Sequence, residues 1–208
     1  EAMRPRLYTP KSAEQKELNS LVNLSNTLKM NLVQLTNQLS SMEGGIAKKI
    51  SKKMISHIQK EIALVEKKLA ELVEQDDTFK EQLKLMTSIK GVGKLTAVKV
   101  LARVQNIQSF ENAKQFAAFI GVSPRQHQSG KSKGKTRMSC LGDAGLRKSL
   151  YMAALVAKRH NEALQPFVKR LQEAGKAPKT IIGAVMRKLA HWIFAVLKHK
   201  QSFDAAYV

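Results

Sequence analysis

The sequence predicts a mainly all-α fold, in which a coiled-coil helical hairpin precedes a helical domain with a basic loop or small β-hairpin. Two observations predict this fold. Between residues 11 and 76 the apolar residues recur at alternating steps of three and four, which is the heptad pattern of paired helices. After residue 77 the apolar residues keep a helical spacing, and no alternating stretch is long enough to found a sheet.

These patterns divide the chain into four parts. The first ten residues are expected to be extended, because Pro5 and Pro10 disfavour helix in the residues before them. We predict a lead-in linker, a coiled-coil hairpin, a helical domain with a helix-hairpin-helix motif, and a tail, at residues 1–10, 11–76, 77–203 and 204–208.

The hairpin is predicted from two heptad seams separated by a glycine pair. Gly44 and Gly45 break the helical pattern, and Ser25 is a polar interruption of the first seam. The seam residues are Leu18, Leu21, Leu28, Leu32, Leu35, Leu39 and Met42, then Ile55, Ile58, Ile62, Val65, Leu69 and Leu72. Helices of about 28 residues would run about 40 Å. We interpret the hairpin as a spacer or an arm that pairs protomers into dimers or tetramers; the alternative is a hairpin packed on its own domain.

A short turn follows the next predicted helix, which begins with the cap residues 76–78 and runs through Met86. Gly91 and Gly93 flank Val92, and the residues after them have a helical apolar face. This pattern resembles the helix-hairpin-helix module of DNA-binding proteins. Glycines let the backbone approach a phosphate, and the N–H groups of the following helix can hold it. The predicted nucleic-acid contacts here are Lys90, Gly91, Gly93 and Lys94. A simple structural turn is the alternative, whereas a dinucleotide-binding turn is excluded because no apolar strand precedes it.

Four more helices are predicted in the second half of the chain. They cover residues 110–120, a segment that begins near Asp143, residues 162–174 behind an Asn161 cap, and a last segment introduced by Pro178. The last segment carries a broad apolar stripe. We place Trp192 of that stripe in the core rather than on a surface that stacks bases.

Net charge is the unusual property of the composition. The chain has 36 Lys and Arg against 16 Asp and Glu, a net charge of +20. Residues 91–208 carry 21 basic and 5 acidic residues, so most of the excess lies there. An excess so uneven is typical of a surface that attracts nucleic acid, rather than of charge spread for solubility.

Other classes of protein are excluded by what the sequence lacks. Cys140 is the one cysteine, so a disulfide or a multi-cysteine zinc site within the chain is excluded, and the histidines show no metal-ligand spacing. No secretory signal or long uncharged apolar run is present, so we expect a soluble, cytoplasmic protein that does not contact membranes.

The basic loop lies between Gly121 and Tyr151, with the sequence GVSPRQHQSGKSKGKTRMSCLGDAGLRKSLY. Asp143 is its one acid, and residues 126–138 could form a small hairpin around Gly130 or Gly134. Because unpaired buried charge is costly, the loop must face water or a polyanion. The predicted nucleic-acid contacts are Arg125, Gly130, Lys131, Lys133, Lys135, Arg137, Arg147 and Lys148. The candidate nucleophiles are Ser123, Ser129, Ser132 and Ser139.

The order of motifs between about residues 88 and 197 resembles one family. The motifs are GVG-x-x-T-A, S-F-x-N-x-x-x-F-A-A-F-x-G-V-x-P, then S-G, then G-D-x-x-L-R-x-x-L-Y. They resemble the insertion-sequence transposases of the Piv/MooV invertase type, whose members include the bridge-RNA-guided recombinases. The lead-in and the heptads are similar to the linker and coiled coil of that family.

The resemblance implies a catalytic serine that attacks a DNA phosphodiester and becomes covalently joined to the strand. The Ser-Gly motif of the family falls on Ser129 and Gly130, so Ser129 is the implied nucleophile. Nearby cations could neutralise the phosphate, and Gly130 would let it come close. From the residues alone, Ser129 is better explained as a turn serine that bonds its own backbone. His127 could resemble a general base, but we interpret it as a surface histidine.

The resemblance also implies an N-terminal RuvC-like domain whose four acidic residues hold a divalent metal such as Mg²⁺. Residues 1–10 do not supply it, so we expect no cofactor in this chain, which would be a C-terminal fragment or a truncated derivative. Our first hypothesis is a portion of a bacterial, nucleoid-associated DNA transposase that binds DNA and possibly guide RNA and is inactive by itself. The alternatives are a non-catalytic nucleic-acid-binding and oligomerisation module, and a structural coiled-coil protein that binds no nucleic acid.

Overall fold

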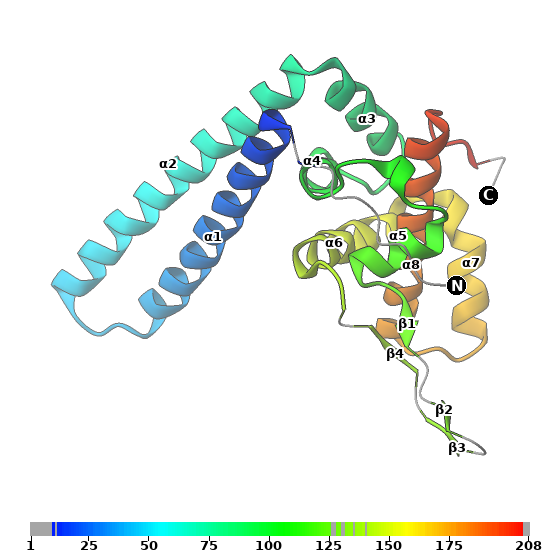
Figure 1. Ribbon diagram of the computed structural model, residues 1–208. Coiled ribbons are helices and arrows are strands. Elements are labelled where there is room, and N and C mark those ends of the chain that lie inside the picture. The colour runs from blue at the N-terminus through cyan, green and yellow to red at the C-terminus, as the bar shows by residue number, and fades with distance from the viewer. Residues whose placement is uncertain are drawn as a thin grey trace. The chain divides into compact units, whose positions relative to one another are not determined.

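The computed structural model describes residues 10, 12–125, 128–129, 132–134, 136–139 and 141–205. Helices dominate these residues, which confirms the mainly all-α fold (Figure 1). The chain forms two compact units, a helical hairpin at residues 1–76 and a larger helical domain at residues 77–208.

The hairpin unit consists of two long helices that lie side by side, α1 (Ala13–Ser41) and α2 (Gly45–Gln75) (Figure 1). The Ser12 side chain caps α1 by accepting a hydrogen bond from the Gln15 N–H group. The buried residues of the seam are Leu18, Val22, Ser25, Ser51, Ile62, Val65, Leu69 and Val73, whereas the predicted seam residues nearer the turn, such as Leu32 and Ile55, are half-buried. In a hairpin of two helices, each helix buries only the side that faces its partner, so the rest of its surface remains exposed.

The described residues of the domain form six helices and two 3-10 turns, besides the short strands of the basic loop. The helices are α3 (Asp77–Thr87), α4 (Lys94–Arg103), α5 (Ala113–Ile120), α6 (Ala144–His160), α7 (Gln165–Glu173) and α8 (Pro178–His199), and the turns are η1 (Ile107–Ser109) and η2 (Glu162–Leu164). Helix α8 forms the centre, because α3, α5, α6 and α7 all pack against it. Trp192 of α8 is 8% exposed, so its predicted place in the core is confirmed.

Two predicted helices differ from the structure at their first residues. The helix expected at 110–120 begins only at Ala113, because the Asn112 side chain caps it by accepting from the Gln115 N–H group. The helix expected at 162–174 is instead η2 followed by α7. Asn161 Oδ1 accepts from the Ala163 N–H group and holds the tight turn, and Pro166, which has no N–H group, suits the first turn of a new helix.

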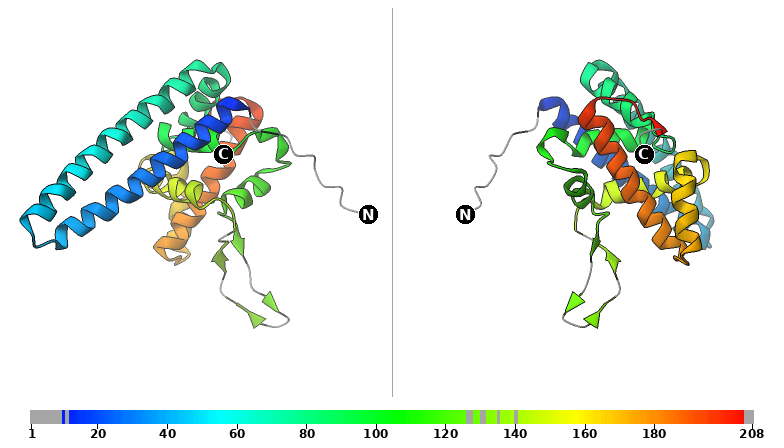
Figure 2. Two further views of the ribbon diagram at one scale, coloured as in Figure 1. Left: turned by 60° about the vertical axis from the view of Figure 1, so that its left-hand side comes forward. Right: turned by 90° about the vertical axis from the view of Figure 1, so that its right-hand side faces the viewer.

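Four short strands form an arm in the basic loop. Strand β1 (Pro124–Arg125) pairs antiparallel with β4 (Arg137–Met138), and Arg125 lies opposite Arg137. Strand β2 (Gln128–Ser129) pairs antiparallel with β3 (Ser132–Lys133), and Ser129 lies opposite Ser132. The two pairs extend away from the helices of the domain, as both views of Figure 2 show. Gly134, one of the two glycines around which a turn was predicted, is described and follows β3, whereas Gly130 lies outside the described residues.

The chain folds back on the domain after α8. The Phe203 N–H group donates a hydrogen bond of 2.8 Å to Ser88 Oγ. The Phe203 ring lies 4.5 Å from the Trp192 ring, centroid to centroid. Within the described residues, α8 is the one helix long and apolar enough to cross a membrane, and 61% of its apolar stretch is buried in the protein, as in the core helix of a soluble domain.

Candidate nucleic-acid interface

A basic groove lies where the foot of the arm meets α6 and α8. It consists of two adjoining hollows of about 360 and 390 Å³, which share Met138, Lys179 and Gly183. The lining cations are Arg137 of β4, Arg147 and Lys148 of α6, and Lys179 and Arg187 of α8. None of the described lining residues is acidic. We call this surface the basic groove.

Local structure explains why these cations converge. Asp143 caps α6 by accepting from the Leu146 N–H group at 2.8 Å, so Arg147 follows in the first turn of that helix. Helix α8 begins with Pro178, which places Lys179 in its first turn beside the foot of the arm. A Cβ atom on Gly183 would lie 3.0 Å from Met138 Cε, so the missing side chain lets β4 lie close to α8.

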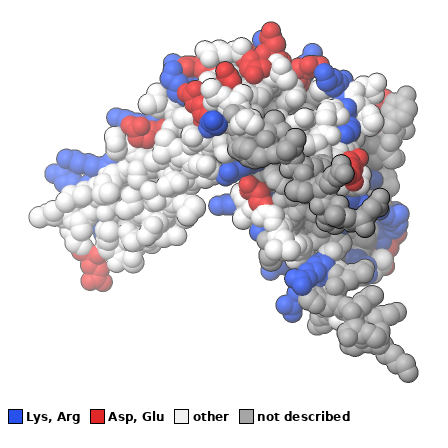
Figure 3. All heavy atoms as spheres, in the orientation of Figure 1, with Lys and Arg blue, Asp and Glu red and all other residues white. Residues whose placement is uncertain are grey.

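The positive charge of the groove has no carboxylate to neutralise it among its described lining residues. Asp143 is the nearest acid in the loop, but it is engaged in the α6 cap and in an ion pair with Arg103, whose Nε lies 3.2 Å from Asp143 Oδ2. The Arg147 Nη1 atom is buried and has no hydrogen-bond partner among the described residues. Figure 3 shows Lys and Arg atoms gathered near the β1–β4 pair. The groove therefore suits an anionic ligand.

The structure brings together three predicted contacts and adds two that sequence reasoning missed. Arg137, Arg147 and Lys148 line the groove, and Arg125 lies opposite Arg137 at the foot of the arm. Lys179 and Arg187 belong to α8, and only the apolar stripe of that helix was considered in the sequence analysis. The signal that could have identified them is their spacing of eight residues, which places both on one side of a helix.

The other predicted residues of the arm belong to its outer strand pair or lie outside the described residues. Ser129 lies in β2, and Lys133 in β3 is paired with Gln128. Gly130, Lys131 and Lys135 lie outside the described residues, as does His127.

The turn between α3 and α4 uses its two predicted glycines differently. Gly91 has φ of +112°, and a Cβ atom there would lie 2.5 Å from Ala157 Cβ, so its missing side chain serves packing against α6. The Lys90 carbonyl accepts a 2.8 Å hydrogen bond from Asn161 Nδ2, and Lys90 Nζ lies 3.5 Å from Glu162 Oε1. These contacts hold the turn on the core.

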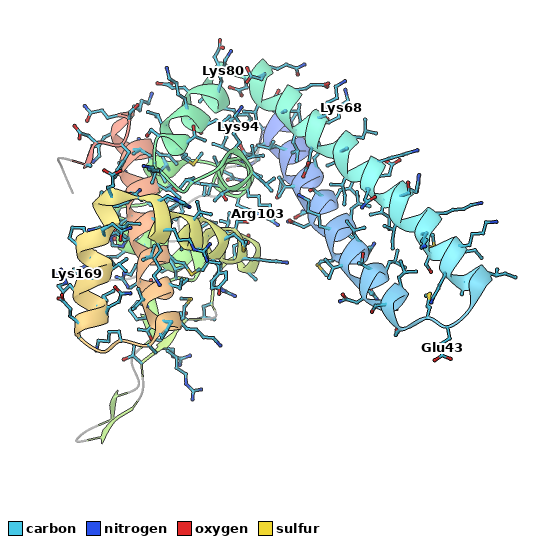
Figure 4. All side chains as sticks on the ribbon, turned by 180° about the vertical axis from the view of Figure 1, so that it is seen from behind. Glu43, Lys68, Lys80, Lys94, Arg103 and Lys169 are labelled. Carbon is cyan, nitrogen blue, oxygen red and sulfur yellow. The ribbon has the colours of Figure 1, made fainter. Side chains whose placement is uncertain are left out.

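The start of α4 is the open side of this turn. Gly93 and Lys94 are exposed, and the N-cap residue Gly93 offers no side chain to the first N–H groups of the helix. A Cβ atom on Gly93 would meet nothing within 4 Å. Figure 4 shows Lys94 at the start of α4 and Arg103 at its end. Uncapped N–H groups beside a lysine can bind a phosphate.

A metal site is absent from the described part of the chain, where no three His, Cys, Asp or Glu residues lie close enough to hold an ion. The described candidate site thus consists of the cations of the basic groove at the foot of the serine-bearing arm, and the open N–H groups at the start of α4 are a separate feature.

Comparisons with known proteins support the resemblance read from the motifs. Residues 83–169 match the family model described as "Transposase IS116/IS110/IS902 family". The pilin gene-inverting proteins of Moraxella bovis and Moraxella lacunata are each 31% identical over 204 residues, which cover 96% of this chain and 62% of the relative. The transposase for insertion sequence element IS1111A of Coxiella burnetii is 33% identical over 127 residues, 59% of this chain and 35% of the relative. Residues 83–169, which include the α3–α4 turn, the arm and α6, therefore form a transposase domain of the IS116/IS110/IS902 family.

Proposed function

We propose that this chain is the DNA-binding and nucleophile-bearing portion of a transposase or recombinase that moves or inverts DNA segments. The chain spans 62% of the length of the pilin gene-inverting proteins, so the complete activity would need further protein. The observation that carries the proposal is the basic groove at the foot of the arm. Its cations from the arm and α6, Arg137, Arg147 and Lys148, lie inside the segment that matches the transposase family, and α8 adds Lys179 and Arg187 from beyond that segment. DNA is the partner that this chemistry fits, and a guide RNA would present the same phosphate backbone.

The groove binds the backbone of a strand by replacing its counterions. Arg137, Arg147 and Arg187 offer planar guanidinium groups that bind two phosphate oxygens at once, whereas the two lysines act as point charges. Each phosphate that the groove neutralises releases counterions, which makes affinity depend steeply on salt. The open N–H groups at the start of α4 provide a second anchor for a phosphate.

Ser129 is the proposed nucleophile. Its hydroxyl oxygen attacks the phosphorus atom of a phosphodiester, a bond from serine oxygen to phosphorus forms, and the bond from phosphorus to the leaving strand breaks. The serine loses its hydroxyl proton as it attacks, and the leaving strand oxygen takes up a proton to become a hydroxyl group. A later attack by a strand hydroxyl group on the same phosphorus breaks the bond from phosphorus to serine, and the serine oxygen takes up a proton again. Lys133, which belongs to the same strand pair as Ser129, would offset part of the charge of the transition state. The family resemblance implies a divalent metal held by acidic residues outside this chain, and it would supply further charge stabilisation.

Charge removal in the groove tests the binding part of this function. The double variant Arg137→Gln/Lys179→Gln should bind duplex DNA more weakly, and the slope of log affinity against log salt should fall by about 0.9 for each lost phosphate contact. The matched control is Lys84→Gln/Lys169→Gln, which removes the same charge from exposed lysines outside the groove. Fluorescence anisotropy across a salt series measures both quantities. Equal slopes for the two double variants would refute the groove as the binding surface.

Removal of the hydroxyl tests the catalytic part. In a protein extended by the domain that the relatives carry, Ser129→Ala should abolish the covalent protein–DNA adduct while DNA affinity stays within about twofold, because a methyl group cannot attack phosphorus. Ser132→Ala is the matched control, since Ser132 lies opposite Ser129 in the ladder. Adducts are detected by denaturing gel electrophoresis with labelled DNA. An adduct that survives Ser129→Ala would refute Ser129 as the nucleophile, whereas an unsubstituted protein that forms no adduct would favour the alternative function, a non-catalytic nucleic-acid-binding module.

A further inference from the structure

The lysines of the hairpin are concentrated in the first half of α2. Residues 45–60 hold five lysines and no acid, whereas the acids of α2 lie between residues 61 and 74. We call Lys48, Lys49, Lys52 and Lys53 the tip lysines, because they lie in the first three turns of α2, directly after the α1–α2 turn. All four are exposed. In Figure 3, Lys and Arg atoms gather along α2 near that turn, while the face of the hairpin toward the viewer is largely uncharged.

This distribution opposes the stability of the helix. The first turn of a helix favours acidic side chains because the N-terminal end of the helix dipole is positive, yet α2 has none there and carries its acids in its second half. The tip lysines also form two like-charge pairs at a spacing of four residues, Lys48 with Lys52 and Lys49 with Lys53, and such pairs repel. A sequence selected for folding alone would reverse this order of charges.

No carboxylate compensates the tip lysines within the described residues. Two ion pairs of the hairpin join Lys29 with Glu66 and Lys68 with Glu71, and both involve the half of α2 distant from the turn. Glu43 is the acid nearest in sequence, and Figure 4 shows its side chain at the turn, pointing away from the helices. The tip therefore presents a patch of uncompensated positive charge that a bound anion would stabilise.

The composition of the patch indicates what kind of anion it fits. Residues 42–60 contain no Arg, Tyr, Trp or Phe. Arg and aromatic residues are enriched in protein–protein interfaces and Lys is depleted there, so an acidic protein partner is disfavoured. The four lysines span about 7.5 Å of helix axis, whereas each strand of a duplex carries a charge about every 3.4 Å. Flexible lysine stems can follow such an extended row of charges.

We propose that the tip lysines form a second nucleic-acid-binding surface, which holds the phosphate backbone of DNA or RNA at the end of the hairpin. This inference rests on the proposed function of the chain, because it assigns an additional contact to the same class of partner. The surface belongs to the hairpin unit and shares no residue with the basic groove of the domain.

The test uses the whole chain and the variant Lys48→Gln/Lys49→Gln/Lys52→Gln/Lys53→Gln, since Gln keeps a high helix propensity without the charge. Affinity for a DNA duplex and for a structured RNA is measured across a salt series. With at least one of the two nucleic acids, the slope of log affinity against log salt should fall by two or more, because each lost duplex contact contributes about 0.9. The nucleic acid whose slope of log affinity against log salt falls more is the one that the tip lysines bind.

The matched control removes four exposed lysines that belong to neither surface, as Lys84→Gln/Lys169→Gln/Lys176→Gln/Lys200→Gln, so that both variants lose the same net charge. Equal slopes for the two quadruple variants with both nucleic acids would overturn the inference. So would a variant that loses only its binding to phosphatidylserine vesicles, since that result would assign the patch to a membrane surface. The groove variant Arg137→Gln/Lys179→Gln separates the two proposals. If it alone lowers the slope, the function stands and the tip surface falls; if neither variant lowers it, the function falls as well.

Discussion

His191 on α8 shows how burial affects one titratable residue of the domain. Its Nε2 atom is buried and has no hydrogen-bond partner among the described residues. Burial lowers the pKa of His191 below its usual range, and the positive charges of Arg187 on α8 and Lys114 on α5 lower the pKa further. The folded protein therefore favours the neutral imidazole.

This lowered pKa predicts a pH dependence of stability. As pH falls below about 6.5, the histidine of the unfolded chain takes up a proton before the folded one does, so the free energy of unfolding decreases with falling pH. His191→Gln should reduce the loss of Tm between pH 7.5 and 5.5, whereas His199→Gln, at an exposed position, should not. Glu14 and Glu71 also have a lowered pKa, but carboxylates act at lower pH, outside this window. Thermal melts at both pH values check the prediction, and identical losses in all three proteins would contradict it.

At the scale of elements, the α3–α4 turn places a closely packed glycine and an exposed glycine within three residues. Gly91→Ala should destabilise the domain by about 2 kcal/mol or more, because the new Cβ atom would lie 2.5 Å from Ala157 Cβ and the residue has φ of +112°. Gly93→Ala is the matched control and should change stability by less than about 0.5 kcal/mol, since its Cβ atom meets nothing within 4 Å. Urea unfolding measures both values. Similar losses for the two variants would show that the close approach to α6 is not what requires glycine.

Sequence periodicity predicted most of these elements because local patterns determine them. The heptads placed both hairpin helices, and the side chains of Asp143 and Asn161 act as caps at the predicted helix starts. The 3-10 turns were missed because a three-residue segment has no periodic signal. The packing role of Gly91 could not be read from the sequence either, since it depends on Ala157, which is distant in the chain.

At the scale of the whole molecule, the basic groove combines cations from elements that are distant in the sequence, and only tertiary structure brings them together. The loop sequence gave Arg137, Arg147 and Lys148, but Lys179 and Arg187 join them only because the foot of the arm packs against α8. Charge composition thus indicates the class of partner that we propose, whereas the shape of the surface depends on how three elements meet.

Assembly is the last property at this scale, and the hairpin offers a surface for it. Exposed apolar residues accumulate toward its turn, and they are Met30, Val33, Ile46, Ile50 and Met54. Isolated exposed apolar residues are common, but a run of them beside a half-buried seam favours pairing with further helices of a second protomer. The predicted dimer or tetramer therefore remains our expectation.

The triple variant Ile46→Gln/Ile50→Gln/Met54→Gln should sediment as a monomer at micromolar concentration, while the native chain sediments as an oligomer, because the apolar area that pairing would bury is removed. Sedimentation velocity distinguishes the two. The control is Leu95→Gln/Met152→Gln, which changes exposed apolar residues of the domain and should leave the oligomer intact. A native chain that is already monomeric would rule out this assembly.

The contact between Phe203 and Trp192 makes tryptophan fluorescence a probe of the segment that follows α8. Trp192 is the one tryptophan of the chain, and its indole lies under the ring of a residue that is also hydrogen-bonded to the α3–α4 turn through Ser88. The fluorescence of Trp192 should therefore report whether the segment that carries Phe203 is packed on the domain. A fusion tag should be attached after this segment and should not replace it. A shortened chain that lacked Phe203 would emit at longer wavelength as water reached the indole.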